Sequence, residues 1–193
     1  EDLSPVVEVS EAAVKAGKIK YLGFNGLGET DAIKESLDRY SPSAIHTCYN
    51  LLNPTSGYDL PPSFSYQNFE QLMNVASDNG IGTVGIRILA GGALSGSVER
   101  HPIAQQNVAP ISTSNTFQED VNRTSDFQFL ITGGFVENFV EASVRFAISN
   151  NDLDTALIGL SNFDQLKQAI TYVDRGPLTQ EAIDKIREIW AIT

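Results

Sequence analysis

The sequence predicts an α/β fold in which four parallel strands alternate with helices and one more helix ends the chain. Two observations predict it. Short runs of apolar and β-branched residues, typical of buried strands, recur along the chain. Longer segments with apolar residues at helical spacing lie between them. Strands separated by helices of this size pair in parallel through right-handed crossovers.

The first helix and strand are predicted at residues 6–18 and 19–24. The helical pattern stops at Gly17, and glycine is the usual residue just beyond a helix C-terminus. The same order repeats in a helix at 30–40, with Thr30 as the expected N-cap, and a strand at 44–48.

A third unit follows a proline-rich loop. The pattern predicts a helix at 66–80 and a strand at 81–88, "IGTVGIRI". The strand contains Arg87 and leads into glycine, alanine and serine. Residues 97–131 then form a long loop or insertion, polar over 97–116 and with a short helix at 117–131.

The last part of the chain predicts an amphipathic helix at 134–151 and a strand at 154–160. A helix at 162–173, which Asn162 can cap, and a final helix at 179–190 follow. All 193 residues form one domain, because 41% hydrophobic content suffices for one core of this size. Complete (β/α)8 barrels usually occupy about 250 residues, so the chain is short for one.

Composition narrows the function. The formal net charge of -11 opposes binding to nucleic acid or to an anionic membrane, and a small-molecule ligand is favoured. Cys48 is the only cysteine, so no internal disulfide or zinc-ligand set is expected, and the thiol is interpreted as a small buried apolar group. The acidic start does not resemble a signal peptide, and a cytoplasmic location is expected.

Usual nucleotide fingerprints do not explain the glycines: no GxGxxG follows a predicted strand, and no GxxxxGK[ST] occurs. Four other blocks carry a resemblance, namely "GKIKYLGFNG" (17–26), "YNLLN" (49–53), "GIGTVGIRILAGGALSG" (80–96) and "EASVRFAISNNDLDTALIGLSNFDQLKQAI" (141–170). In order and spacing they resemble the aldo/keto reductases. The third block is most similar to members related to sugar dehydrogenases.

The resemblance implies that the chain is the C-terminal half of a TIM barrel, from the fifth strand to the eighth, with the family's C-terminal helix. It also implies binding of NADP, or NAD, across the carboxyl ends of the strands. The substrate would be a small carbonyl compound, an aldehyde or a sugar. The 97–131 segment is the part expected to contribute most to its pocket.

Cofactor-binding positions are carried over residue by residue. The loop after the seventh strand lies against the pyrophosphate in this family, which here assigns Arg87, Leu89, Gly91 and Gly92. Glycine backbone approaches phosphate closely, and an arginine adds a charge-assisted hydrogen bond. The alternative is structural: the glycines permit a tight turn and Arg87 pairs with a carboxylate.

Other positions match less closely. Asn25 and Gly26 stand where the family has Ser-Asn near the nicotinamide amide, and His46 stands where many members have glutamine. Ile86 replaces a stacking tyrosine. After the eighth strand, the nucleotide-binding positions are Gly159, Ser161, Asn162 and Gln165. Gln165 replaces a frequent arginine of NADP-preferring members and Ala169 a frequent adenine-contacting asparagine, so the choice of cofactor stays open.

The family's catalytic aspartate, tyrosine, lysine and histidine belong to the first four strands, and this chain begins just before the fifth. Tyr49, Lys18 and His46 do not match those positions, so no catalytic residue is assigned. Three alternatives remain open. The chain is a piece of a longer reductase; or a second copy or a separate N-terminal half completes the barrel; or it is a noncatalytic binding or assembly protein. Each edge strand of half a barrel would invite such pairing.

Overall fold

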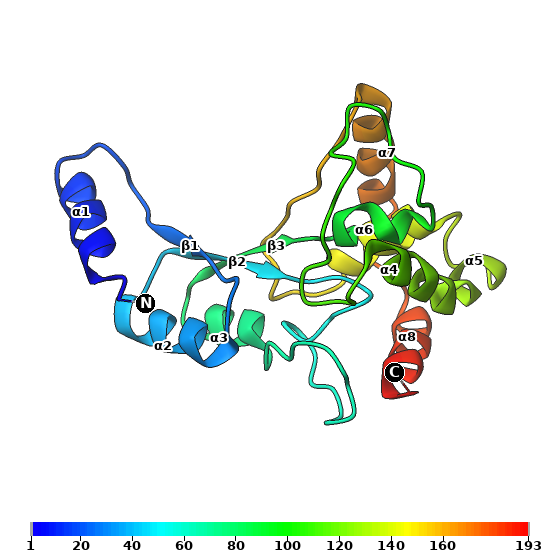
Figure 1. The fold of residues 1–193 in the computed structure, drawn as a ribbon, viewed down its shortest axis with the longest axis horizontal. Coiled ribbons are helices and arrows are strands. Elements are labelled where there is room, and N and C mark those ends of the chain that lie inside the picture. Colours follow the sequence, from blue (N-terminus) through cyan, green and yellow to red (C-terminus); the bar gives the residue numbers. More distant parts are fainter. Residues whose placement is uncertain (1, 193) are drawn as a thin grey trace.

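The computed structural model describes residues 2–192, which form an α/β fold around one four-stranded sheet (Figure 1). The strands are β1 (Gly23–Asn25), β2 (Ala44–Cys48), β3 (Gly82–Ile86) and β4 (Thr155–Ala156). Their spatial order is β1-β2-β3-β4, and each neighbouring pair is parallel. The predicted alternation of four parallel strands with helices is therefore confirmed.

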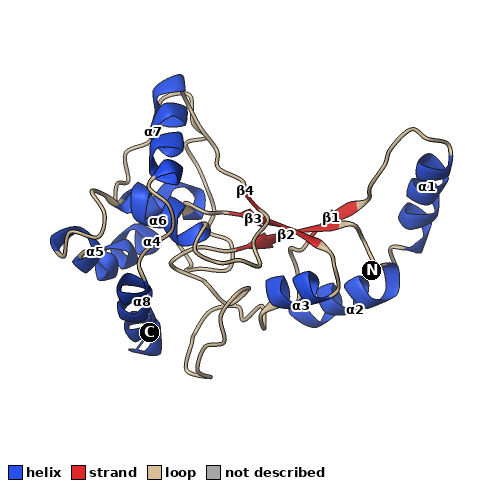
Figure 2. Cartoon of the chain, turned by 180° about the vertical axis from the view of Figure 1, so that it is seen from behind, coloured by secondary structure: helices blue, strands red, loops and turns tan. Residues whose placement is uncertain are grey.

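Two helices, α2 (Thr30–Tyr40) and α3 (Leu72–Asp78), cover one face of the sheet (Figure 2). Their apolar residues pack with Ile45 of β2 in a buried cluster that includes Ile33, Leu37 and Leu72. In register, Phe24 lies beside Ile45 and points to this face, while the next pair, Asn25 and His46, points to the opposite face and is exposed.

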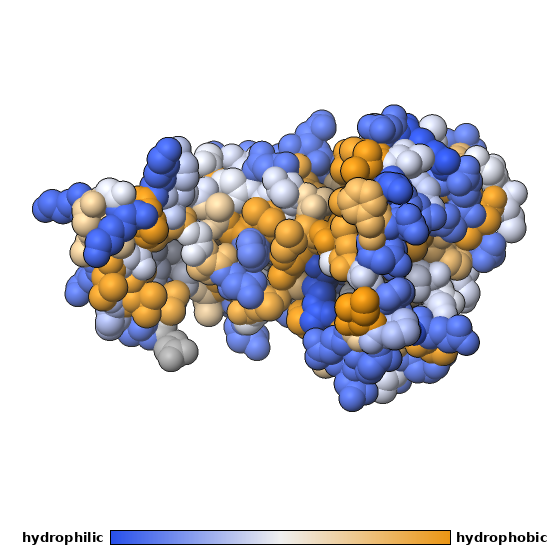
Figure 3. Space-filling model, turned by 90° about the horizontal axis from the view of Figure 1, so that it is seen from above, coloured by the Kyte–Doolittle hydropathy of each residue, from blue (hydrophilic) through white to orange (hydrophobic). Residues whose placement is uncertain are grey.

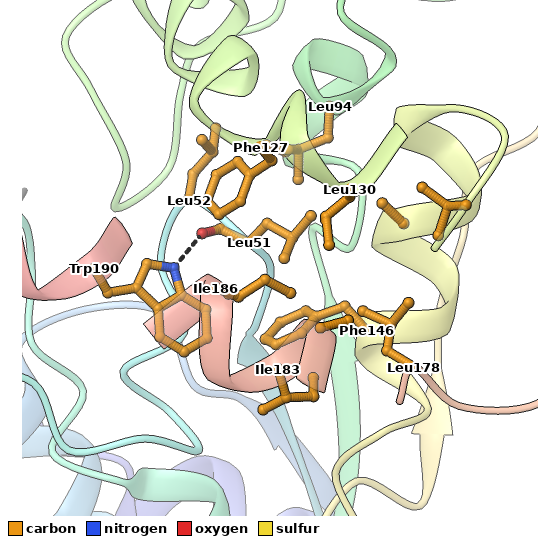
Figure 4. Packing of buried hydrophobic residues seen from close by; sticks show 14 of the residues in the cluster. Leu51, Leu52, Leu94, Phe127, Leu130, Phe146, Leu178, Ile183, Ile186 and Trp190 are labelled. Carbon is orange, nitrogen blue, oxygen red and sulfur yellow. Dashed lines mark hydrogen bonds between the residues drawn. The ribbon is translucent and has the colours of Figure 1, made fainter. Parts of the chain in front are cut away.

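A second cluster lies beyond the carboxyl ends of β2 and β3. It joins residues after β2 to a kinked 3-10 element, η1 (Ala90–Ser95), and to the helices α5 (Phe129–Thr132), α6 (Phe139–Ala147) and α8 (Gln180–Ile192). Figure 4 shows Leu51, Phe146, Ile186 and Trp190 in it, with the Trp190 indole N–H donating to the Leu51 carbonyl at 2.8 Å. Full burial of each large apolar side chain contributes about 1.5–3 kcal/mol.

The remaining helices are more exposed. Helix α1 (Ser4–Lys15) has no buried residue and projects from the body, with Ser4 contacting Arg39 and Tyr40 at the end of α2 (Figure 1). Helix α7 (Phe163–Asp174) has only Tyr172 buried. Within residues 2–192, no helix is long and apolar enough to cross a membrane.

The face of the sheet opposite α2 and α3 has apolar surface in its middle, seen from above in Figure 3. Apolar side chains of α7 and of the segment after β4 are also exposed, among them Leu157, Phe163 and Ile170. Isolated exposed apolar side chains are ordinary, whereas a contiguous group of them is typical of an interaction surface.

Both edge strands are shorter than predicted. The 19–24 strand is β1 at Gly23–Asn25, and the 154–160 strand is β4 at Thr155–Ala156. At β4, the Leu157 N–H donates to the Gly85 carbonyl at 2.8 Å, and β3 then ends because Arg87 takes a positive φ of 60°. The predicted 81–88 strand therefore ends at Ile86. Residues 158–160 have no strand beside them to pair with, and β4 ends as well.

The predicted helix at 66–80 is wrong in its first part, because α3 begins only at Leu72. Glu70 and Gln71 have positive φ values of 48° and 56°, which no helix accommodates. Thr30 is not an N-cap either: it is the first helical residue, and its hydroxyl donates to the Asn68 carbonyl at 2.8 Å.

Other helices are confirmed with different limits. The 117–131 helix is divided into α4 (Phe117–Thr124), a 3-10 turn η2 (Ser125–Phe127) and α5. The 134–151 helix is α6 at Phe139–Ala147, because the Asn138 side chain caps it by accepting from the Glu141 N–H. The 6–18 helix spans Ser4–Lys15, and Gly17 follows it with a φ of +70°.

Candidate functional site

A cavity of about 1080 Å³ lies at the carboxyl ends of β3 and β4. Five segments of the chain form it: the glycine-rich bend after β3, the loop at 99–109, α6, residues 157–161 after β4, and α7. Most of the positions predicted for the cofactor line it, namely Arg87, Leu89, Gly91, Gly92, Gly159, Ser161 and Gln165. The fold therefore brings the predicted positions after β3 and those after β4 together in one cavity.

The bend at 87–96 has an unusual concentration of left-handed backbone. Gly91, Gly92 and Gly96 have φ values of +68°, +107° and +76°, and Arg87 and Ala90 also have positive φ. A Cβ atom at Gly91 would lie 2.8 Å from Nη1 of Arg87 and 2.7 Å from a Val108 methyl group. The left-handed backbone favours glycine here, and the Arg87 guanidinium packs against the position that a side chain would take. Strained backbone of this kind clusters at functional sites.

Arg87 stands directly after β3, half-buried, and lines the cavity. Its carbonyl accepts a hydrogen bond of 3.0 Å from the side-chain amide of Asn50. Within residues 2–192, its guanidinium makes no hydrogen bond and no ion pair. The structural alternative, in which Arg87 pairs with a carboxylate, is therefore not what the fold shows, and the charge is available to an anion.

The loop at 99–109, here called the strap, folds against the bend. Arg100 connects the two segments, because Nη1 donates to the Gly91 carbonyl at 2.8 Å and Nε donates to the Gln105 carbonyl at 2.7 Å. Its guanidinium also lies 5.0 Å from the centre of the Phe117 ring. The sequence marked 97–131 as a functional loop but did not single out Arg100. A lone arginine in a polar loop of an acidic chain was the available signal.

The strap continues into residues anchored by a buried carboxylate. Asp120 has no exposed surface, and it accepts from the Thr113 hydroxyl at 2.6 Å and from the N–H and hydroxyl of Ser114. Thr116 then caps α4 in a reciprocal arrangement with Glu119. The loop is therefore tied at its far end by charge-assisted hydrogen bonds.

The opposite end of the cavity is the start of α7. Asn162 caps the helix as predicted, since its side-chain oxygen accepts the Gln165 N–H at 2.9 Å. The Ser161 N–H donates to Oε1 of Gln165 at 2.7 Å. These donors are satisfied within the chain. Gln168 and Ala169 line the same end, while the exposed Asn162 does not line the cavity.

Asn25, Gly26 and His46 lie elsewhere, at the carboxyl ends of β1 and β2. Asn25 is opposite His46 in register, and the Gly26 N–H donates to the His46 carbonyl at 2.8 Å. A Cβ at Gly26 would come within 2.6 Å of that oxygen, so only glycine fits. His46 is exposed rather than a core residue. Asn25 and His46 lie on the uncovered face, whereas Gly26 is buried beside Ile45, and none of the three lines the cavity.

Two buried groups near β2 are unsuited to acid–base chemistry. Burial raises the pKa of the Cys48 thiol to about 11, although the positive charge of Arg87 acts in the opposite direction. Burial also raises the pKa of Tyr49 well above its ordinary value, and its ring packs on Phe146 with 4.9 Å between centroids. Both side chains serve the core, as expected for Cys48.

The model of the aldo/keto reductase family matches residues 2–191. The chain belongs to the aldo/keto reductase family. The resemblance predicted from four blocks is thereby confirmed. No match was found among the curated proteins.

Solved structures of aldo/keto reductases share the fold. The holo form of aldo-keto reductase AKR11C1 from Bacillus halodurans superposes with a TM-score of 0.70 at 19% sequence identity, covering 100% of this chain and 58% of that one. The apo form gives a TM-score of 0.67 at 19% identity, covering 100% of this chain and 59% of that one. The chain thus spans less than two thirds of the length of these family members.

Proposed function

We propose that this chain is the dinucleotide-binding half of an NAD(P)H-dependent oxidoreductase that interconverts carbonyls and alcohols. One observation carries the proposal: an unpaired guanidinium, that of Arg87, lies in a cavity against glycine backbone. Two arginines and a single carboxylate, Glu99, line that cavity in a chain whose formal net charge is -11. This local reversal of charge favours an anionic ligand.

The residues fit a dinucleotide. Arg87 can hold a phosphate oxygen, and Gly91 and Gly92 line the same cavity without side chains of their own. The polar and small residues at the start of α7 suit a nucleoside. A bound nicotinamide dinucleotide supplies the hydride, and the role of these residues is to bind it, to orient it and to exclude water.

The catalytic acid is proposed to lie outside this chain. Tyr49 is buried in the core with a raised pKa, and burial keeps it from donating a proton to a substrate. A small aldehyde or sugar is the proposed substrate, on the basis of family membership alone.

The proposed partner is a further set of β/α units, either an N-terminal half of the same barrel or a second copy of this chain. The uncovered sheet face, the unpaired outer edges of β1 and β4, and the exposed apolar residues of α7 support this proposal. Such edges and surfaces associate readily.

The test is calorimetric titration of NADPH and of ADP-ribose into the folded chain. Saturable binding is expected, and Arg87→Ala should weaken it by about 10- to 150-fold, the range of one hydrogen bond to a charged group. Arg39→Ala on α2, an exposed arginine 3.8 Å from Asp2, is the matched control and should bind normally. Absence of binding by the folded chain would favour a noncatalytic assembly protein, and unchanged affinity in Arg87→Ala would return Arg87 to a structural role.

A further inference from the structure

A second cavity, of about 460 Å³, lies between the loop that follows β2 and the end of α8. It shares no lining residue with the cavity at the carboxyl ends of β3 and β4. Its volume is in the range of sites for small molecules, about 300–1,000 Å³. Tyr58 of the loop and Trp190 of α8 line it, with 5.1 Å between their ring centroids. Together with Leu60 and Pro61, they give the cavity an apolar wall on which a ligand can pack.

Arg187 of α8 brings a positive charge to this second cavity. Its guanidinium lies 5.0 Å from the centre of the Tyr58 ring. Lys185 on the same helix lies 3.8 Å from Glu181, whereas Arg187 forms no hydrogen bond and no ion pair with any residue of 2–192. A guanidinium that stacks on an aromatic ring keeps the N–H groups at its edge free, and these match the geometry of a carboxylate. Arg187 is therefore available to a carboxylate from outside the chain.

Asp59 brings the opposite charge to the same cavity. It is exposed, and within the described part of the chain its side chain has no hydrogen-bond or ion-pair partner, Arg187 included. Two opposite charges that line one cavity without pairing are complementary to a ligand that carries both charges. Asp59 would repel a phosphate or a dicarboxylate, and Arg187 would repel an amine that has no carboxylate.

Gln71 adds a polar group that is held on a strained backbone. It has a positive φ of 56°, and Glu70 before it has one of 48°, although neither is glycine. The Gln71 N–H donates to the Thr55 carbonyl at 2.8 Å, which holds this turn against the loop after β2. The side-chain amide lines the cavity and, among residues 2–192, has no hydrogen-bond partner. Backbone strain of this kind clusters at functional sites, and a free amide supplies both a donor and an acceptor to a ligand.

We infer that this second cavity binds a free amino acid with an apolar side chain. The α-carboxylate pairs with Arg187 and the α-ammonium group pairs with Asp59. The apolar side chain packs against the wall that Tyr58 and Trp190 form. The inference does not depend on the proposed function, because the two cavities have no residue in common.

Titration of three related compounds into the folded chain tests the inference. They are L-phenylalanine, 3-phenylpropionate, which lacks the ammonium group, and phenethylamine, which lacks the carboxylate. Trp190 reports binding, since it lines the cavity and is the only tryptophan of the chain. L-phenylalanine should change its fluorescence saturably, and each analogue should bind at least about tenfold more weakly because it has lost one charged hydrogen bond. No saturable change in a folded chain, or equal binding of either analogue, would overturn the inference.

Two variants assign the charges. Arg187→Gln should weaken binding of L-phenylalanine and of 3-phenylpropionate about tenfold and spare phenethylamine, whereas Asp59→Asn should weaken L-phenylalanine and phenethylamine and spare 3-phenylpropionate. Lys185→Gln is the matched control, because it removes the same charge from α8 outside the cavity and should bind all three compounds normally. An equal loss for all three compounds in either variant would contradict the assignment. ADP-ribose binding should be unchanged in every variant, so failure of this inference leaves the proposed function standing.

Discussion

The side-chain amide of Asn50 donates a hydrogen bond of 3.0 Å to the carbonyl oxygen of Arg87. Its oxygen accepts the N–H groups of Leu52 at 2.9 Å and Asn53 at 3.0 Å. One buried side chain thus joins the turn after β2 to the residue after β3. Because this contact restrains the backbone at Arg87, we expect Asn50 to be a positioning residue for the proposed anion site.

Replacement of Asn50 separates its two functions. Asn50→Asp keeps the acceptor for Leu52 and Asn53 but removes the donor to the Arg87 carbonyl. We expect Asn50→Asp to weaken ADP-ribose binding about tenfold. Asn50→Ala, which removes both, should lower the free energy of unfolding by about 2–3 kcal/mol because buried backbone groups lose their partners. Calorimetry and urea unfolding measure the two effects, and normal binding by a folded Asn50→Asp variant would contradict the positioning role.

Cys48 should be unreactive in the native protein. Its side chain has no exposed surface, and burial raises its pKa to about 11, so the nucleophilic thiolate is scarce at neutral pH. We expect a chromogenic disulfide reagent to label the chain only after urea unfolding. Cys48→Ser provides the blank. Rapid stoichiometric labelling in native buffer would show that the sheet opens at β2.

Glu141 is a buried carboxylate at the centre of an ion-pair network between α6 and the end of α7. Its oxygens accept from the Glu137 N–H at 2.8 Å, from Arg145 at 2.9 Å and from Arg175 at 2.7 Å. Burial alone would raise its pKa, but these hydrogen bonds outweigh burial and hold the pKa below the usual value. The ionised form therefore stabilises the fold.

The sign of the pH dependence follows. Because the folded-state pKa is lowered, the stabilisation is present above the unfolded pKa of about 4.3 and is lost as pH falls through the folded value. Glu141→Gln should cost about 3 kcal/mol at pH 7, and the gap to the unsubstituted protein should narrow in acid. Urea unfolding of both proteins at pH 7 and in acid measures the difference in the free energy of unfolding. Glu137→Gln, an exposed partner of Arg175, is the control and should cost under about 1 kcal/mol; an equal loss in both variants would contradict burial as the cause.

The central elements of the fold were predictable because their signals are local. Strand β2 lies at Ala44–Cys48 as predicted, and apolar periodicity located each helix. The ends of elements were less predictable because distant contacts set them. The helix before β3 is shortened where the Asn53 amide and the Thr30 hydroxyl take the carbonyls of Gln67 and Asn68 from a helical ladder.

The candidate site also contains residues that the sequence identified and residues that only the structure identified. Arg87 and the glycines were assigned from the sequence through the family resemblance, because glycines after a strand are by themselves equally typical of a tight turn. Asn50 was not, because its contact joins residues 37 positions apart. Arg100 became apparent only when the strap was seen against Gly91. Contacts between loops depend on the whole fold, so a lone arginine in a polar loop does not by itself indicate what it contacts.

The outer face of α7 carries exposed apolar residues from which we predict association between copies of the chain. Phe163, Leu166, Ile170 and Val173 recur at helical spacing on one side and are exposed, Phe163 by 67% and Ile170 by 53%. The cavity-lining Gln165 and Gln168 lie on another side of the helix. The apolar stripe thus lies on a different side of α7 from the residues that line the cavity.

We expect the isolated chain to associate as its concentration rises, and Ile170→Lys to reduce that association in light scattering coupled to size exclusion. Stability should change by less than about 0.5 kcal/mol, since an exposed side chain adds little to the core. Added lysine lowers the net negative charge and so weakens general repulsion between copies; a reduced association must therefore come from loss of apolar contact. Thr171→Lys, an exposed position on the same helix, introduces the same charge off the stripe and should associate like the unsubstituted chain. A chain that stays monomeric at every concentration would show that the stripe does not drive association between copies.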